Sequence, residues 1–425
     1  MKPAGFDALL AEVAPLADRF VAAGHRLYLV GGIVRDGLLG RDTSTDPDLD
    51  LTTDAAPAAV RALVAPLADA VWRQGERFGT IGARIGGRSY EITTHRAEAY
   101  TDDSRKPVVR FSSSVVDDLS RRDFTVNAMA VEVPSGELVD PFGGAGDLAA
   151  QVLRTPLDPH VSFSDDPLRM LRAARFSAGY KLTPRPELVA SMAETAPRLA
   201  IVSMERVRDE LDKLLAVAAP RRALELLVET GVATRFLPEL DDPSTRRVAF
   251  GALDALVASH PELSPAARLA TLLHPLAPES VRARVAALRA SHVVSRYVVA
   301  LATAWRRIAA LDDADASARR LVHELGPVTD DALRVASCVP ESAGPAALLA
   351  DRLHVLRARG ELDSLEPALG GDEIMRALGI GPGPAVGDAA AFVLTLRLDE
   401  GVRDPEVARA RLEQWWAERA SRVEP

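Results

Sequence analysis

The sequence has almost no cysteine and no long apolar run. Its 425 residues contain one cysteine, Cys338, which excludes disulfides and cysteine-based zinc sites within a single chain. No segment of about 18 consecutive apolar residues is present, and the N-terminus lacks the basic, then apolar, then small-residue order of a secretion signal. We therefore expect a cytoplasmic protein with no membrane partner.

Lysine is scarce as well, and nearly all of the 51 basic residues are arginines. The formal net charge of −9 argues at first against a nucleic-acid partner, but the distribution of charge matters more than its sum. Arginine binds phosphate with a planar fork of donors and stacks on bases, whereas lysine carries a point charge. The total charge therefore leaves nucleic-acid binding open.

What is present is an ordinary globular composition, with 48% hydrophobic and 26% charged residues. A chain of this length is expected to form roughly two to four domains. From about residue 220 onward the pattern is almost wholly helical and rich in alanine, leucine and arginine. The strand-forming patterns are confined to the N-terminal part.

The most informative stretch begins with an apolar run, Leu27 to Val30, which is too short for a helix and typical of a buried strand. Gly31 and Gly32 follow, and because neither has a Cβ atom they let the backbone turn tightly and lie against a ligand. Residues 33–39 then predict a short helix, which Gly40 ends.

A second strand is predicted at residues 48–51, where charged and apolar residues alternate. Asp48 and Asp50 therefore project from one face, with their Cα atoms roughly 7 Å apart. Two such carboxylates can hold Mg²⁺ together with substrate phosphates, although an isolated pair is also common on a solvated edge strand. Glu91, in a hairpin predicted at residues 75–96, can approach the pair as a third ligand; an outward-facing glutamate is an equal alternative.

Two later segments concentrate arginine beside acidic residues. Arg121 and Arg122 precede Asp123, and together they supply donors for phosphate and partners for sugar hydroxyls. The alternative is an ordinary charged helix start. The polar residues 97–118 before this motif predict a loop.

The second arginine-rich segment is a helix predicted to start near Asp166, with Pro167 at its first position. Arg169, Arg172 and Arg175 recur at intervals of three and are expected to share one face. An arginine row with an aspartate at its N-terminal end offers donors and acceptors to a nucleotide base and its phosphates. A solvated basic face is the alternative.

These segments together resemble a known family. Their order and spacing look like those of the bacterial tRNA nucleotidyltransferase/poly(A) polymerase family, which is the class II branch of the polymerase-β-like nucleotidyltransferases. The segments are, in order, LVGGIVRDGLLG, DLDLTT, RRDFTVNAMA, DDPLRMLRAARF and ERVRDELDKLL. The similarity covers roughly residues 20–220. The run at residues 370–389 resembles the family's C-terminal tRNA-contacting region.

The resemblance implies a role for each matching residue. Asp48 and Asp50 match the two catalytic, metal-binding carboxylates. The positions that hold the triphosphate are matched by the glycine turn, which is Gly31 and Gly32, and by Arg35. The other nucleotide-binding positions are Arg122 for phosphate, Asp123 near the ribose, Asp166 and Arg169 for the base edge, and Arg172 and Arg175 as further contacts.

The implied reaction is the addition of CMP and AMP to the 3′ end of tRNA. The tRNA 3′-hydroxyl attacks the α-phosphate of CTP or ATP and releases pyrophosphate, with Mg²⁺ as the cofactor. Positioning and charge neutralisation suffice for this chemistry. A poly(A) polymerase, an enzyme adding only CC or only A, and a non-catalytic RNA-binding homologue remain alternatives, and either a monomer or a homodimer is expected.

The fold implied is an α+β nucleotidyltransferase (polymerase-β-like) head at residues 1–155, followed by all-α segments. These are a neck with the base-reading helix (156–245), a body (246–345) and a tRNA-contacting tail (346–425). The body resembles a degenerate HD-type phosphohydrolase segment, because His274 is present but Pro275 stands where the family has aspartate. We expect His274 to be packed or on the surface, and the body to lack phosphohydrolase activity.

Overall fold

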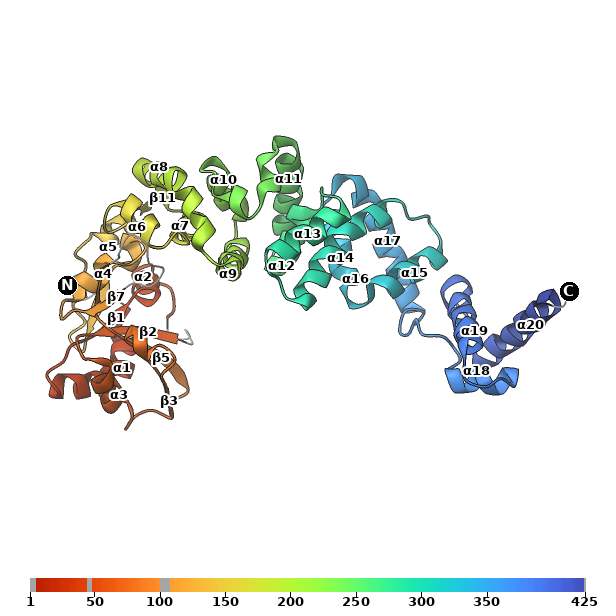
Figure 1. Cartoon of the computed structure of the whole chain (residues 1–425), viewed down its shortest axis with the longest axis horizontal. Coiled ribbons are helices and arrows are strands. Elements are labelled where there is room, and N and C mark those ends of the chain that lie inside the picture. The colour runs from red at the N-terminus through yellow and green to blue at the C-terminus, as the bar shows by residue number, and fades with distance from the viewer. Residues whose placement is uncertain (1–4, 44–47, 100–107, 424–425) are drawn as a thin grey trace. The chain divides into compact units, whose positions relative to one another are not determined.

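The computed structural model describes residues 5–43, 48–99 and 108–423. The chain divides into two compact units, Met1–Asp241 and Asp242–Pro425 (Figure 1). The first unit contains the sheet and the segments that resemble the nucleotidyltransferase family. The second is helical.

A seven-stranded sheet forms the centre of the first unit, in the order β3-β4-β5-β2-β1-β8-β9. Its strands are β1 (Leu27–Val30), β2 (Asp48–Thr53), β3 (Ala70–Trp72), β4 (Thr80–Ile85), β5 (Arg88–Thr94), β8 (Ala130–Val133) and β9 (Leu138–Val139). Strands β2 and β5 run parallel, and the other neighbours run antiparallel. The strand–turn–helix–strand succession predicted from residues 27–53 is confirmed, with α2 at Gly32–Leu38.

One face of this sheet carries the main hydrophobic core. Alternate strand residues, among them Leu49 and Leu51, are buried there against α1 (Asp7–Ala22) and α3 (Pro57–Val64). Because side chains alternate along a strand, Asp48 and Asp50 point to the opposite face. On that face a smaller cluster around Tyr28 covers part of β1. The core thus orients the two carboxylates.

Residues 97–118 are not a loop throughout. A short hairpin pairs β6 (Arg96–Ala99) with β7 (Val108–Phe111), and α4 (Val115–Ser120) begins at the N-cap Ser114. The hydroxyl of Ser114 accepts a hydrogen bond from the Asp117 amide, and this cap starts the helix. The loop prediction was therefore wrong at both ends, because hairpin pairing and a serine cap outweighed polar composition.

Helices follow the sheet in the first unit: α5 (Gly144–Ala149), α6 (Pro159–Asp165), α7 (Arg169–Gly179), α8 (Pro186–Thr195), α9 (Met204–Leu215) and α10 (Pro220–Glu229). Helix α7 packs against α9 and α10 through buried residues that include Met170, Leu171 and Ala174. Its arginines at positions 172 and 175 bond to Asp123 and, on α9, to Glu210. This packing fixes which side of α7 its arginines occupy.

The second unit contains helices α11 to α20 (Figure 1). They are α11 (Pro243–Ser259), α12 (Pro265–Leu273), α13 (Pro278–Ala287), α14 (His292–Ala309), α15 (Asp315–Leu325), α16 (Thr329–Ser337), α17 (Pro340–Ala358), α18 (Gly371–Leu378), α19 (Pro384–Thr395) and α20 (Pro405–Val423). His274 is 1% exposed, its Nδ1 lies 2.6 Å from the Thr271 carbonyl oxygen, and its ring packs edge-on against Trp305. The prediction of a packed His274 is confirmed.

The α+β head followed by helical segments is confirmed as the fold class. The finer boundaries at residues 155, 245 and 345 stay predictions, since the chain separates into compact units at residue 241. In the described parts of the chain, no helix has both the length and the apolarity needed to cross a membrane.

Candidate active site

The two predicted carboxylates lie together on the open face of the sheet. Asp48 and Asp50 are exposed on β2, while Leu49 between them is fully buried. Neither carboxylate accepts a hydrogen bond or forms an ion pair with a described residue. Both are therefore available to a cation, which the two-carboxylate arrangement of Mg²⁺ sites requires.

A tight turn at Gly31 brings an arginine close to this pair. Gly31 has a φ of +75°, and a Cβ atom there would lie 3.0 Å from Arg122 Nη1 and 3.9 Å from Asp50 Oδ2. Glycine is needed both for this conformation and for this close approach. The turn predicted from the paired glycines thus holds β1, Asp50 and Arg122 together.

The pKa of Asp50 reflects these surroundings. Although the Asp50 side chain reaches solvent, the surrounding protein partly desolvates its carboxyl group and raises its pKa; the Arg122 guanidinium opposes that rise, and the Asp48 carboxylate adds to it. A divalent cation would remove the conflict between two adjacent negative charges, because it favours the ionised form of both.

Asp118, on α4, holds the two arginines of the 121–122 motif. Its carboxylate is fully buried and forms ion pairs with Arg121 at 3.1 Å and Arg122 at 3.4 Å. Burial acts to raise the pKa of Asp118, but the charges of Arg122 and Arg121 outweigh it and lower the pKa. Sequence reasoning did not name Asp118, although its spacing of three and four residues from the arginines was a usable signal.

Asp123 is the centre of a buried polar network. Its carboxylate accepts hydrogen bonds from Asn127 at 3.0 Å and from two nitrogens of Arg172 at 2.6 and 2.9 Å. Burial acts to raise the pKa of Asp123, but Arg172 and the Asn127 hydrogen bond lower it overall. Asn127 also accepts a hydrogen bond from Arg35 at 2.6 Å. Asp123 therefore connects the head to α7.

Arg35 lies behind this network. Its side chain is buried, donates to Asn127 and Asp36, and stacks on the ring of Tyr180 with 4.1 Å between guanidinium carbon and ring centroid. Its contact with a triphosphate, implied by the resemblance, stays a prediction. In the structure Arg35 bonds to protein groups, and its hydrogen bond to Asn127 helps to orient that side chain.

The arginine row on α7 divides between two environments. Arg172 binds Asp123, whereas the Nε atom of Arg175 donates to Glu210 on α9. Glu210 is only 4% exposed and also lies 3.8 Å from Arg172. Arg175 therefore braces α7 against α9 in the structure, and its predicted nucleotide contact is untested.

Asp166 and Arg169 lie at the start of α7, as the resemblance implies. Asp166 accepts hydrogen bonds from the Leu168 amide and from Arg206 on α9, both at 3.3 Å. Arg169 donates to the Ser162 hydroxyl at 2.7 Å and to the carbonyl oxygen of Arg121. The helix begins at Arg169, three residues after the predicted cap. These bonds set the directions of both side chains.

A cavity of about 300 Å³ brings the arginine motifs together. It is lined by Arg121, Arg122, Asp123, Asp166, Arg169 and Arg172. Four guanidinium groups and two carboxylates give it a net positive charge, and bidentate arginine donors suit phosphate oxygens. Arg122 borders this cavity and also lies against the turn at Gly31, so the cavity adjoins Asp50. Arg121, which the sequence motif offered with Arg122 as a phosphate donor, is the lining residue to which the family resemblance assigned no role.

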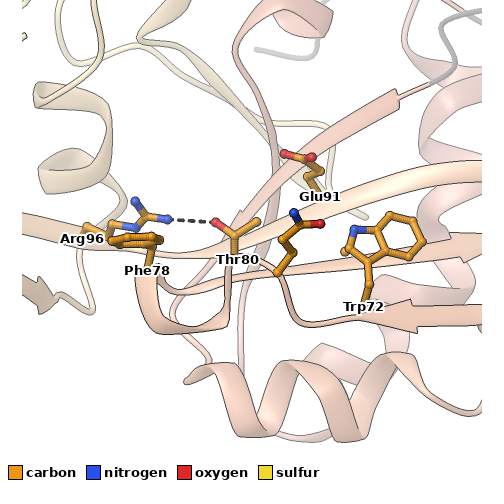
Figure 2. A pocket seen from close by; sticks show the side chains of 8 residues that line it. Trp72, Phe78, Thr80, Glu91 and Arg96 are labelled. Carbon is orange, nitrogen blue, oxygen red and sulfur yellow. Dashed lines mark hydrogen bonds between the residues drawn. The ribbon is translucent and has the colours of Figure 1, made fainter. Parts of the chain in front are cut away.

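Glu91 lies beside the carboxylate pair but opens onto a different cavity. Glu91 on β5 is in register with Asp50 on β2, so both side chains point to the same face. Burial, followed by the charges of Asp50 and Asp48, raises the pKa of Glu91. Among the described residues, no group of three potential ligands lies close enough to hold a metal ion. Glu91 borders a cavity over β3, β4 and β5 (Figure 2).

Comparison with protein families identifies two matching segments. Residues 27–154 match the model described as the Poly A polymerase head domain. Residues 181–242 match the model described as the probable RNA and SrmB-binding site of polymerase A. The resemblance inferred from the sequence motifs is confirmed over these segments.

Curated relatives match a little over half of the chain. The chain is 40% identical over 242 residues to the CCA-adding enzyme of Bacillus licheniformis, which covers 57% of this chain and 59% of that enzyme. It is 42% identical over 220 residues to the CCA-adding enzyme of a Geobacillus species, covering 52% of each. The matches thus span only about half to three fifths of the relatives' length.

Solved structures match over the full length. The crystal structure of the Bacillus stearothermophilus CCA-adding enzyme in complex with CTP aligns with a TM-score of 0.77, 28% identity and complete coverage of both chains. The Thermotoga maritima CCA-adding enzyme complexed with tRNA aligns with a TM-score of 0.65 over 96% of this chain and 95% of that one. At 22% identity, the second match supports the fold alone.

Proposed function

Because residues 27–154 match the model of the poly(A) polymerase head domain, we propose that this protein is a nucleotidyltransferase that adds CMP and AMP to the 3′ end of tRNA. The observation that carries the proposal is the arginine-lined cavity that adjoins Asp50 through Arg122. A positive cavity beside two carboxylates that have no partner among the described residues suits a nucleoside triphosphate whose α-phosphate lies at the carboxylates. The relatives named CCA-adding enzymes support tRNA as the acceptor.

Each part of the cavity has a role in this proposal. Arg121, Arg122 and Arg172 neutralise the triphosphate, and Asp123 keeps Arg172 in place through its two hydrogen bonds. The acceptor 3′-hydroxyl oxygen bonds to the α-phosphorus while the bond to pyrophosphate breaks, and the hydroxyl proton is released. Charge neutralisation and positioning are the main requirements of such a transfer.

Asp48 and Asp50 would hold the divalent cation, for which Mg²⁺ is our proposal. Among the described residues neither carboxylate has a hydrogen-bond or ion-pair partner, and both lie on one face of β2, which fits a site completed by substrate phosphates. When bound, the cation supplies charge stabilisation for the attacking and leaving oxygens. Glu91 is a third carboxylate on the same face.

Asp166 and Arg169 are proposed to select the base. One offers acceptors and the other donors, so the pair can bond to the edges of cytosine and adenine. A base that leaves either group unpaired in the cavity is penalised heavily. Asp166 accepts a hydrogen bond from Arg206, and Arg169 donates one to Ser162, so both side chains are restrained before the nucleotide binds.

The experiment is nucleotide addition to a tRNA transcript that lacks its 3′ CCA, with CTP and ATP offered singly and together in the presence of Mg²⁺. We expect CC from CTP alone and CCA from the mixture. Asp50→Ala should abolish incorporation while leaving tRNA binding largely intact. Long A tails on unrelated RNA would instead identify a poly(A) polymerase, and products ending at CC or gaining only A would identify a partial enzyme.

A further inference from the structure

A row of four residues crosses the sheet from the carboxylate pair to its edge. Asp50 on β2 is in register with Glu91 on β5, Glu91 with Gly82 on β4, and Gly82 with Trp72 on β3. Residues paired across neighbouring strands point to the same face. Trp72 and Asp50 therefore share a face, about three strand spacings of roughly 4.8 Å apart.

Gly82 allows the indole of Trp72 to lie across the sheet. A Cβ atom at Gly82 would lie 1.9 Å from Trp72 Nε1, so a larger residue there would displace the ring. The indole covers β4, and the Trp72 residue remains 36% exposed at the sheet edge. An aromatic ring held flat, with an exposed side, is the usual platform for a nucleic-acid base.

The indole borders a cavity of about 440 Å³, which is large enough for one nucleoside (Figure 2). Phe78, Thr80, Glu91 and Arg96 also line it, and Arg96 donates a hydrogen bond to the Thr80 hydroxyl at 2.8 Å. Arg96 brings a positive charge suited to a backbone phosphate. The cavity thus combines aromatic and polar groups with one cationic side chain, Arg96, and one acidic side chain, Glu91.

The position of this cavity distinguishes it from the arginine-lined one. In the sheet, β2 lies between β5, which carries Glu91, and β1, which leads into the turn at Gly31 beside Arg122. The carboxylate pair therefore lies between the two cavities. In phosphoryl transfer the attacking and leaving oxygens are roughly in line on opposite sides of the phosphorus. If the triphosphate occupies one side, the acceptor must arrive from the other.

We propose that the cavity over β3, β4 and β5 binds a nucleotide at the 3′ end of the acceptor RNA, with its base stacked on Trp72. This inference rests on the proposed nucleotidyl transfer and adds an acceptor subsite to it. Trp72 orders the RNA end so that its 3′-hydroxyl reaches the phosphate at Asp50. The paired residues Asp50, Glu91, Gly82 and Trp72 place the Trp72 cavity and the Asp50 carboxylate on the same face of the sheet.

The test compares steady-state kinetics of the full-length wild type and Trp72→Ala on a tRNA transcript lacking its CCA end. Loss of one stacked base should raise the KM for the acceptor by about 5- to 150-fold. The KM for CTP and its equilibrium Kd should change by less than about twofold. Trp72→Phe should restore most of the acceptor affinity.

Two further variants separate stacking from stability. Gly82→Ala keeps Trp72 but displaces its indole, so the KM for the acceptor should rise as in Trp72→Ala. As a control, Val21→Ala removes an exposed apolar side chain from α1 in the same unit and should leave both KM values unchanged. A selective rise in acceptor KM for both cavity variants supports the subsite.

The outcomes separate this inference from the proposed function. If the wild type adds nucleotides and Trp72→Ala leaves the acceptor KM unchanged, or raises the KM for CTP equally, the acceptor subsite is wrong and the nucleotidyltransferase stands. If the wild type adds no nucleotide to any RNA, the proposed function fails first.

Discussion

At the scale of single residues, the site depends on a glycine and an aspartate whose surroundings are unusual. Gly31 combines a positive φ with close approach to Arg122, and Asp50 carries a raised pKa beside a second carboxylate.

Gly31→Ala is expected to reduce both stability and activity. The positive φ should cost about 1–2 kcal/mol of folding free energy, and the new methyl group would displace Arg122 from Asp50. Gly40→Ala is the matched control, because Gly40 has a φ of +70° but no atom within 4 Å of the added Cβ. Urea denaturation should show similar losses in both variants, with CTP incorporation falling only in Gly31→Ala. Equal CTP incorporation by Gly31→Ala and Gly40→Ala would contradict a role for the close approach of Arg122 to Gly31.

The raised pKa of Asp50 predicts how activity depends on pH. A higher pKa leaves more of the carboxyl protonated at a given acidic pH, and the protonated form does not bind a cation. Activity should therefore fall on acidification at a higher pH than for an ordinary aspartate. Raising the Mg²⁺ concentration should move this acid limb to lower pH, because the cation competes with the proton. If the acid limb of the pH profile did not respond to Mg²⁺, it would reflect protonation of a group other than Asp50.

At the scale of elements, helix α7 is positioned by acidic residues on neighbouring elements. Glu210 on α9 binds Arg175 and lies near Arg172, while Asp123 binds Arg172 from the head. The helix is thus held from two sides by ion pairs with low exposure. The cavity keeps its shape because α7 is fixed in this way.

Glu210→Gln is predicted to weaken nucleotide binding. The loss of one charge-assisted contact should raise the KM for CTP and ATP roughly 2- to 13-fold, corresponding to about 0.5–1.5 kcal/mol. Glu225→Gln on α10 is the control, since Glu225 forms an exposed pair with Arg221 away from the cavity. Steady-state kinetics with each triphosphate measure the effect. An unchanged KM in Glu210→Gln would show that α7 does not need this anchor.

At the scale of the whole molecule, the chain consists of two compact units, and the candidate site lies wholly in the first. Each unit has its own hydrophobic core, because buried clusters form separately in the sheet and in the C-terminal helices. Unfolding is therefore not expected to be a single two-state transition.

Calorimetry of the full chain should resolve this organisation. Mg²⁺ with CTP at 100 times its Kd should stabilise the first unit by about 2.7 kcal/mol and raise only its unfolding temperature. Mg²⁺ without CTP is the control for cation binding. One cooperative transition that shifts as a whole would contradict independent units.

Much of the candidate site follows from local sequence patterns. Period-two alternation places Asp48 and Asp50 on one face, and the glycine pair predicts the turn before α2. The helix at Arg169 also follows from apolar spacing. These features depend on residues close together in the chain, so local geometry is enough to predict them.

The sequence alone therefore determined the carboxylate pair, the glycine turn and the arginine-bearing helix. Only the tertiary structure decided which arginines reach the cavity, because residues three apart on a helix rotate by about 60° each time and Arg175 is turned about 120° from Arg169. Arg175 consequently meets Glu210, and Arg35 is buried behind Asn127. The row from Asp50 to Trp72 depends on strand register, which pairs residues far apart in sequence.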